Sequence, residues 1–85
     1  MKLLYFAWVR ERIGQGEEEL DPPPEIRNVA GLLGWLAERG PGYAHALADL
    51  SAVRVAVNQE HAKLDAPVRL GDEVAIFPPV TGGGA

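Results

Sequence analysis

The segment with the clearest potential for chemistry is the end of the chain, Phe77-Pro78-Pro79-Val80-Thr81-Gly82-Gly83-Gly84-Ala85. Glycine carries no Cβ, so such a tail can pass through a narrow channel and bring its backbone close to a nucleotide or cofactor. From Phe77 to Gly83 an extended chain spans ~20 Å at ~3.3 Å per residue. A glycine-rich end also fits an inert, disordered terminus. The sequence of a strand, two prolines and then glycines favours a working tail, whose carboxylate would need conversion to an acyl donor.

Side chains that could catalyse a reaction unaided are scarce. The chain contains no cysteine, which excludes disulfides, thiolate metal sites and a cysteine nucleophile. Its only serine is Ser51, and its two histidines, His45 and His61, stand in no carboxylate or metal-ligand pattern. We therefore expect no metal site, no bound cofactor and no catalysis by the chain alone. Catalytic groups would come from partner proteins.

Length and charge narrow the class of protein further. A chain of 85 residues forms one small domain, and its net charge of −4 lacks the basic footprint of a nucleic-acid binder. The acidic residues cluster at Glu17, Glu18, Glu19 and Asp21, and again at Asp72 and Glu73. They suit either a solvated rim or a docking surface for basic partners. The longest apolar run, Leu3 to Val9, is far short of the ~20 residues of a membrane helix, and no cleavage site follows it. We expect a cytoplasmic protein.

The elements that must position the tail begin with this apolar run. Leu3 to Val9 is apolar on both faces and predicts a central strand. A polar connection (10–16) follows, then a short strand from Glu17 to Leu20 that ends at three prolines. The clearest helix starts after Asn28, a favourable N-cap. Its apolar face is formed by Val29, Leu32, Leu33 and Leu36, with Trp35 at the edge.

The second half of the chain predicts a short helix and three strands. Gly40-Pro41-Gly42 should end the main helix, and Tyr43 to Leu50 should form the short one. The alternation of Val53, Val55 and Val57 predicts a strand with one buried face. A turn (58–60), a short strand (61–64) and another turn (70–72) lead to the last strand, Glu73 to Phe77, which ends at Pro78-Pro79.

The economical arrangement of these elements is an α+β fold of the β-grasp type. A mixed sheet of about five strands would wrap across one main helix, with a short helix beside it. Residues 1–79 would form this domain, and residues 80–85 a flexible glycine-rich tail. Phe6 and Phe77 are predicted to be core residues.

The chain resembles the MoaD/ThiS family of ubiquitin-like sulfur carriers, and within it the small subunit of molybdopterin synthase (MoaD). The resemblance covers nearly the whole chain. Its motifs are Phe6-Ala7 with Val9-Arg10-Glu11, then Ala56-Val57-Asn58-Gln59, and finally Gly71-Asp72-Glu73-Val74-Ala75-Ile76-Phe77-Pro78-Pro79-Val80-Thr81-Gly82-Gly83. The terminal motif is the most specific of the three.

The resemblance implies a role in molybdenum cofactor biosynthesis. A MoeB-like adenylating enzyme would use ATP to activate the carboxylate of Gly83, and a sulfur donor protein would convert it to a thiocarboxylate. The tail would then donate sulfur to cyclic pyranopterin monophosphate inside a MoaE-like large subunit, in a heterotetramer. Gly83 and Gly82 would be the reacting end. The residues that contact partners would be Phe77, Pro78, Pro79, Val80 and Thr81.

The chain departs from the family pattern at its end, because Gly84 and Ala85 follow the glycine that is normally last. Two residues displace a carboxylate by up to ~7 Å. Either these residues are removed before activation, or the partners accept a longer tail, or this copy carries no sulfur.

Three other functions remain open. A ubiquitin-like protein modifier would share the adenylation step and differ in joining its tail to target lysines. A sulfur carrier for thiamine or cysteine synthesis would use the same tail, although Phe77-Pro78-Pro79 resembles the molybdopterin branch. An inert interaction domain would not need its terminal glycines at all.

Overall fold

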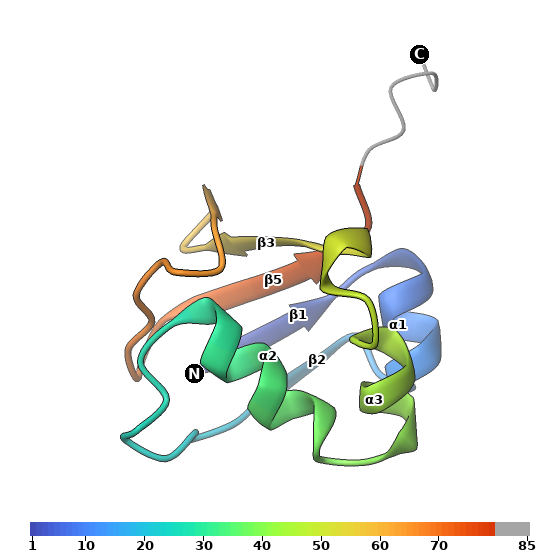
Figure 1. Ribbon diagram of the computed structural model, residues 1–85, viewed down its shortest axis with the longest axis horizontal. Helices are drawn as coiled ribbons and strands as arrows, with labels where there is room; N and C mark the ends of the chain where they lie inside the picture. Colours follow the sequence, from blue (N-terminus) through green and yellow to red (C-terminus); the bar gives the residue numbers. More distant parts are fainter. Residues whose placement is uncertain (80–85) are drawn as a thin grey trace.

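The computed structural model describes residues 1–79. Within that part the chain forms five strands, three α-helices and one 3₁₀ turn (Figure 1). In order they are β1 (Lys2–Tyr5), α1 (Ala7–Ile13), β2 (Glu17–Glu19), α2 (Val29–Ala37), α3 (Pro41–Ala46), η1 (Leu50–Ala52), β3 (Arg54–Val57), β4 (Glu60–Ala62) and β5 (Glu73–Phe77).

The strands form one mixed sheet in the order β2-β1-β5-β3-β4. The first and last strands of the sequence, β1 and β5, pair in parallel, and all the other pairs are antiparallel. This places β5 at the centre of the sheet. The predicted α+β class, a mixed sheet wrapped across one main helix with a short helix beside it, is confirmed.

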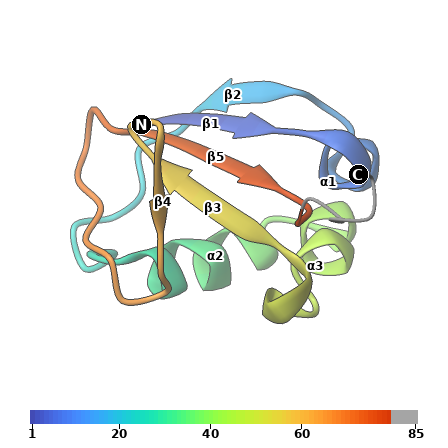
Figure 2. The same ribbon diagram turned by 90° about the horizontal axis from the view of Figure 1, so that it is seen from above.

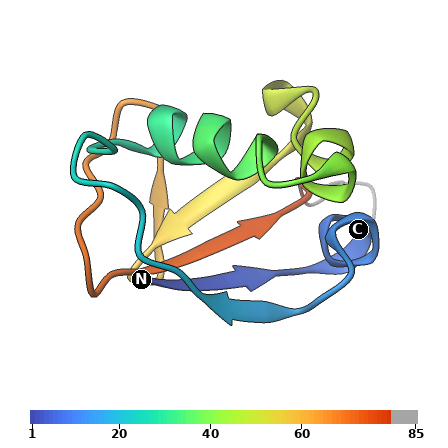
Figure 3. The same cartoon turned by 90° about the horizontal axis from the view of Figure 1, so that it is seen from below.

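One face of the sheet carries the core. Leu3 and Tyr5 of β1 lie beside Val74 and Ile76 of β5 in the register of the two strands, and all four side chains are buried. Figure 2 shows α2 and α3 together on one side of the sheet, and Figure 3 shows the same layers from below. The apolar face of α2 completes the core with Val29, Leu32, Leu33 and Leu36, all fully buried as predicted.

The main helix starts where the sequence predicts and ends earlier. The Asn28 side chain accepts a hydrogen bond from the Gly31 N–H at 2.8 Å and caps α2. The helix ends at Ala37, and Gly40-Pro41 begins α3, because a proline at the first helical position lacks only an N–H that would be unpaired anyway. The short helix predicted from Tyr43 to Leu50 is therefore shifted, since α3 ends at Ala46.

The prediction of a strand from Leu3 to Val9 is wrong beyond Tyr5. Phe6 is extended, Ala7 adopts a φ of 54°, and the chain then turns into α1, so residues 10–16 are not merely a polar connection. Val9 and Ile13 lie four residues apart on this helix and face inward, Val9 being fully buried. Gly14 ends α1 in the left-handed conformation at a φ of 97°.

Other differences are smaller. The fourth strand covers residues 60–62 rather than 61–64. Phe6, predicted to be core, has 48% of its surface exposed, whereas Trp35 is half-buried at the helix edge as predicted. In the described part of the chain, no helix has the length and apolar character to cross a membrane.

Candidate functional site

The described part of the tail motif leaves the domain from the middle of the sheet. β5 lies between β1 and β3, and its last residue, Phe77, pairs in register with Arg54 of β3. Pro78 and Pro79 follow and are half-buried. Proline cannot donate to a strand ladder, so the pairing stops at this point. Of the predicted site residues, Phe77, Pro78 and Pro79 lie in the structure, whereas Val80, Thr81, Gly82, Gly83, Gly84 and Ala85 lie outside the described residues.

A network of side-chain hydrogen bonds at the opposite end of β5 determines where the strand begins. Asn58 sits in a left-handed turn at a φ of 50°, and its side-chain oxygen accepts a hydrogen bond from the Glu73 N–H at 3.0 Å. The Asn58 amide donates to Asp72 at 3.1 Å, and Asp72 in turn accepts from the Arg69 N–H at 2.8 Å. Gly71 supplies the turn at a φ of 91°. Asn58, Asp72 and Glu73 therefore help to set the strand register that places Phe77. The sequence alone did not reveal this role.

The face of the sheet opposite the core surrounds the base of the tail. Paired residues share a face, so register places Leu4, Ala75, Ala56 and His61 in one row across it. Phe77 lies on the same face, and the edge of the His61 ring meets its ring at a centroid distance of 5.8 Å. We call this surface, with Phe6 at its border, the outer face. In Figure 2 both α2 and α3 lie on the other side.

The outer face is apolar at its centre and well suited to bind another protein. Phe6 is the most exposed of its aromatic residues, and its N–H donates to the Ile76 carbonyl at 3.1 Å, which holds it beside the end of β5. Leu4, Ala75 and Phe77 are only half-buried. Aromatic anchors surrounded by small apolar residues are typical of the energetic centre of protein interfaces.

Within residues 1–79, the serine hydroxyl that meets a carboxylate belongs to the cap of a 3₁₀ turn. The Ser51 hydroxyl donates to the Asp49 carboxylate at 2.6 Å, and the same carboxylate accepts from the Ser51 N–H, which caps η1 and lowers the pKa of Asp49. His45 and His61 are both exposed. In the same part of the chain, no three His, Asp or Glu side chains are grouped to hold a metal ion.

The main partly buried polar cluster serves the fold. The Glu18 carboxylate accepts hydrogen bonds from the hydroxyls of Tyr5 and Tyr43, both at 2.7 Å, and from the Gln15 amide at 3.0 Å. Burial, and then the hydrogen bond to Glu18, raise the pKa of Tyr5 well above its usual value. This cluster ties β1 and β2 to α3 beneath the sheet.

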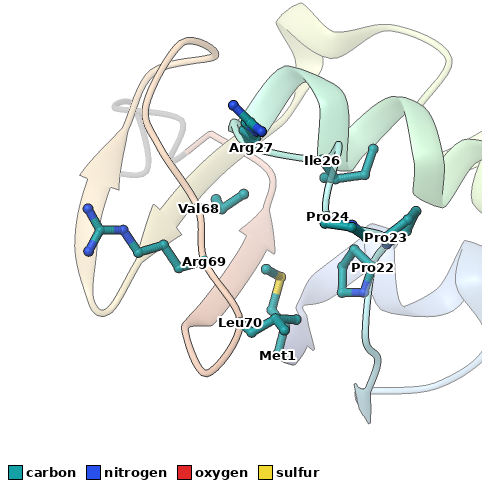
Figure 4. A pocket seen from close by; sticks show the side chains of 9 residues that line it. All are labelled: Met1, Pro22, Pro23, Pro24, Ile26, Arg27, Val68, Arg69 and Leu70. Carbon is teal, nitrogen blue, oxygen red and sulfur yellow. The ribbon is translucent and has the colours of Figure 1, made fainter.

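A separate pocket lies at the start of β1, in Figure 4. It has a volume of about 180 Å³ and is walled mainly by Met1, the prolines 22–24, Ile26 and Val68. β1 and β5 are parallel, so this pocket lies at the end of the sheet opposite the tail.

Comparisons with known proteins agree with this geometry. The sequence profile of the ThiS family matches residues 3–83. The molybdopterin synthase sulfur carrier subunit of Escherichia coli K12 is 41% identical over 83 residues, which cover 98% of this chain and 99% of the relative.

Two solved structures extend the likeness to the fold. A Pyrococcus furiosus protein described as a candidate subunit 1 of molybdopterin converting factor superposes with a TM-score of 0.76 at 31% identity, over 93% of this chain and 95% of that one. Small archaeal modifier protein 1 of Haloferax volcanii gives a TM-score of 0.67 at 25% identity, over 94% and 97% of the two chains.

Proposed function

The chain belongs to the ThiS family, and from this premise we propose that it is a sulfur carrier in molybdenum cofactor biosynthesis. The observation that carries the proposal is the Escherichia coli relative, which is named a molybdopterin synthase sulfur carrier subunit and matches over 98% of this chain. The outer face and the base of the tail suggest how such a carrier would work. A rigid domain presents an acyl-carrying tail, and partners perform the chemistry.

The reacting group in this proposal is the carboxylate of Gly83. A carboxylate oxygen attacks the α-phosphate of ATP in a MoeB-like adenylating enzyme, and pyrophosphate leaves. A persulfide sulfur then attacks the acyl carbon and releases AMP, after which a thiol cleaves the sulfur–sulfur bond and leaves a thiocarboxylate. That sulfur passes to cyclic pyranopterin monophosphate, and two such transfers build the dithiolene. We propose that these steps take place in the cytoplasm, and the chain itself binds no cofactor in this scheme.

The large subunit of molybdopterin synthase is the proposed acceptor of the tail, in a heterotetramer. The outer face supports this role because Phe6 and Phe77 are exposed or half-buried aromatic side chains at the point where the tail begins. Binding there would hold the domain still while the tail enters the partner. The stretch from Val80 to Gly82 would then occupy the channel through which the tail enters the partner.

We propose Gly83, rather than Ala85, as the reacting residue. The family match stops at residue 83, and the sequence continues with Gly84 and Ala85. Ala85 would also put a Cβ where a site for a terminal glycine has no room. We propose that Gly84-Ala85 is removed before activation.

A second candidate function is protein modification, because a solved structure with the same fold is named a modifier protein. It predicts covalent adducts between this chain and other proteins that survive a denaturing gel. Such adducts in wild-type cells, together with unchanged molybdoenzyme activity when the chain is deleted, would favour the modifier function.

Complementation tests the carrier proposal in cells. Escherichia coli lacking its own small subunit would receive the chain ending at Gly83 or a chain lacking Gly82 to Ala85. Molybdoenzyme activity should return with the first and remain absent with the second. Equal activity from both would contradict the proposal, because the acyl group would then be dispensable.

A further inference from the structure

The two border strands of the sheet, β2 and β4, differ in what lies at their free backbone edges. Beside β2 the Leu20 N–H donates to the Met1 carbonyl at 2.9 Å, and residues that bond to the neighbouring strand alternate with residues that face away from it. Glu17 and Glu19 therefore direct their backbone groups to the free edge, and both side chains are exposed. Charged side chains on a border strand oppose the addition of another strand. The β2 edge is thus protected, above all against an acidic partner.

The β4 edge directs the backbone of one residue, His61, away from the sheet. The Asn58 N–H donates to the Glu73 carbonyl at 2.7 Å, so Asn58 faces β5 and Val57, the residue before it, faces β4. Val57 pairs with Glu60 in the register of β3 and β4. By the same alternation His61, the next residue along β4, directs its N–H and carbonyl to the free edge. An extended segment of another protein can pair with these groups and lengthen the sheet.

A groove lies beside β4 on the α2 side of the sheet (Figure 2). It has a volume of about 290 Å³, and its lining includes the buried side chains of Leu33, Val53 and Val55. Ala62 of β4 pairs with Val55 and so points to the same side of the sheet. Leu64, which is 46% exposed, adds a large apolar side chain to the lining. A strand added to β4 would alternate its side chains between the outer face and this groove.

The charged side chains that line the groove favour an acidic ligand. They are Arg54 and Lys63, and among residues 1–79 no acidic side chain joins them in the lining. Arg54 is held in place, because its Nη1 donates to the carbonyls of Ser51 and Val53 at 3.1 and 3.0 Å. Lys63 is exposed and directly follows β4, whereas the acidic Glu60 stands at the other end of that strand. A fixed guanidinium and an ammonium beside an apolar groove match carboxylates that flank an apolar side chain.

We propose that the β4 edge and this groove, together called the β4 flank, bind an extended segment of a protein other than the large subunit, in which acidic and apolar side chains alternate. Its backbone would pair with His61, an apolar side chain would enter the groove beside Leu64, and a carboxylate would lie near Lys63 and Arg54. The inference goes beyond the proposed function, in which the large subunit meets the outer face on the other side of the sheet. Both proteins would therefore bind at once.

Nuclear magnetic resonance titration of the full-length chain tests the inference with two synthetic peptides. In the first, valine alternates with glutamate, and in the second, valine alternates with lysine. The glutamate peptide should shift the amide signal of His61 and the methyl signals of Leu64, and the lysine peptide should bind at least about tenfold more weakly. Equal affinity for the two peptides, or shifts confined to the outer face at Ala75 and Phe77, would overturn the inference.

Variants of the β4 flank measure each contact with the glutamate peptide. Leu64→Ala should weaken the Kd about tenfold through the loss of an apolar contact, and Lys63→Gln about threefold through the loss of an exposed charge pair. His61→Pro should abolish binding, because proline removes the N–H at the free edge without removing a bond to β3. The matched control is Leu70→Ala, which alters an exposed leucine outside the flank and should leave the Kd unchanged.

Thermal unfolding midpoints and the large subunit complete the experiment. A weakened Kd for Leu64→Ala and Lys63→Gln at wild-type midpoints supports the inference, and an unchanged Kd for both overturns it. These two variants decide the matter if His61→Pro does not fold. Addition of the large subunit should leave the shifts caused by the glutamate peptide in place. Displacement of the peptide by the large subunit would overturn the assignment to a separate partner, while complementation still decides whether the chain carries sulfur.

Discussion

The two faces of the central strand differ in what covers them. On the inner face of β5, Val74 and Ile76 have no exposed surface and pack beneath α2. On the outer face of the same strand, Ala75 and Phe77 are half-buried, and the neighbouring Phe6 is 48% exposed. Side chains alternate along a strand, so one five-residue element holds the fold with one set and offers a surface to partners with the other. Stability and partner binding should therefore respond to different substitutions along β5.

The largest effect on stability is expected for the inner face. Ile76→Ala removes three carbons from the core and leaves a cavity, which should lower the free energy of unfolding by about 2–5 kcal/mol. Urea denaturation followed by circular dichroism measures this change. A loss below about 1 kcal/mol would contradict the assignment of the inner face as the core.

Close packing of α1 against α3 is the next test, because the backbone of α1 approaches Gly42 of α3. A Cβ on Gly42 would lie 2.4 Å from the carbonyl oxygen of Arg12, so Gly42→Ala should destabilise the protein by about 1–3 kcal/mol. The matched control is Gly34→Ala on α2, where no atom beyond the helix's own neighbouring backbone lies within 4 Å of the added methyl. It should stabilise the protein by about 0.5–1 kcal/mol. Similar effects from the two substitutions would contradict the close helix contact.

The dependence of stability on alkaline pH tests the environment of the Tyr5 hydroxyl, a polar group on the inner face. Burial and the bond to Glu18 raise the pKa of Tyr5 above its ordinary value of 10.0. Below pH 10 both the folded and unfolded chains keep this proton, so stability is unaffected. Above it the unfolded chain releases the proton while the folded chain retains it, and stability should fall by about 1.4 kcal/mol per pH unit. Tyr5→Phe should remove this part of the slope in urea denaturation between pH 9 and pH 11.

The smallest effect on stability is expected for the outer face. Phe77→Ala should cost about 1 kcal/mol, because the side chain is only half-buried and its main aromatic contact is His61. Affinity for the large subunit should nevertheless fall more than about tenfold, as for an anchor at an interface. A loss of stability like that of Ile76→Ala, with unchanged binding, would remove the distinction between the two faces.

The sequence predicted the elements that carry strong local signals. The Asn28 cap and the leucine spacing located α2, and the prolines after Phe77 located the end of β5. The helix α1 was missed because Leu3 to Val9 is continuously apolar, whereas the break lies in the backbone at Phe6 and Ala7. Gly14, with Val9 and Ile13 one turn apart, was the available signal for this helix.

The site was only partly predictable for a related reason. Phe77-Pro78-Pro79 stands out in the sequence, but its neighbours on the surface are set by pairing between distant strands. Phe6 lies beside the end of β5 because β1 and β5 pair in parallel across most of the chain length. No local pattern contains these relations.

The most direct test of the central claim is the intact mass of the chain after activation. The chain ending at Gly83 and the full-length chain would each be incubated with the adenylating enzyme, ATP and a sulfur donor. Our account predicts that one oxygen is replaced by sulfur on the chain ending at Gly83, and that the full-length chain stays unchanged unless Gly84-Ala85 is removed. If neither chain gains sulfur while the enzyme activates the Escherichia coli carrier in parallel, this protein is not a sulfur carrier.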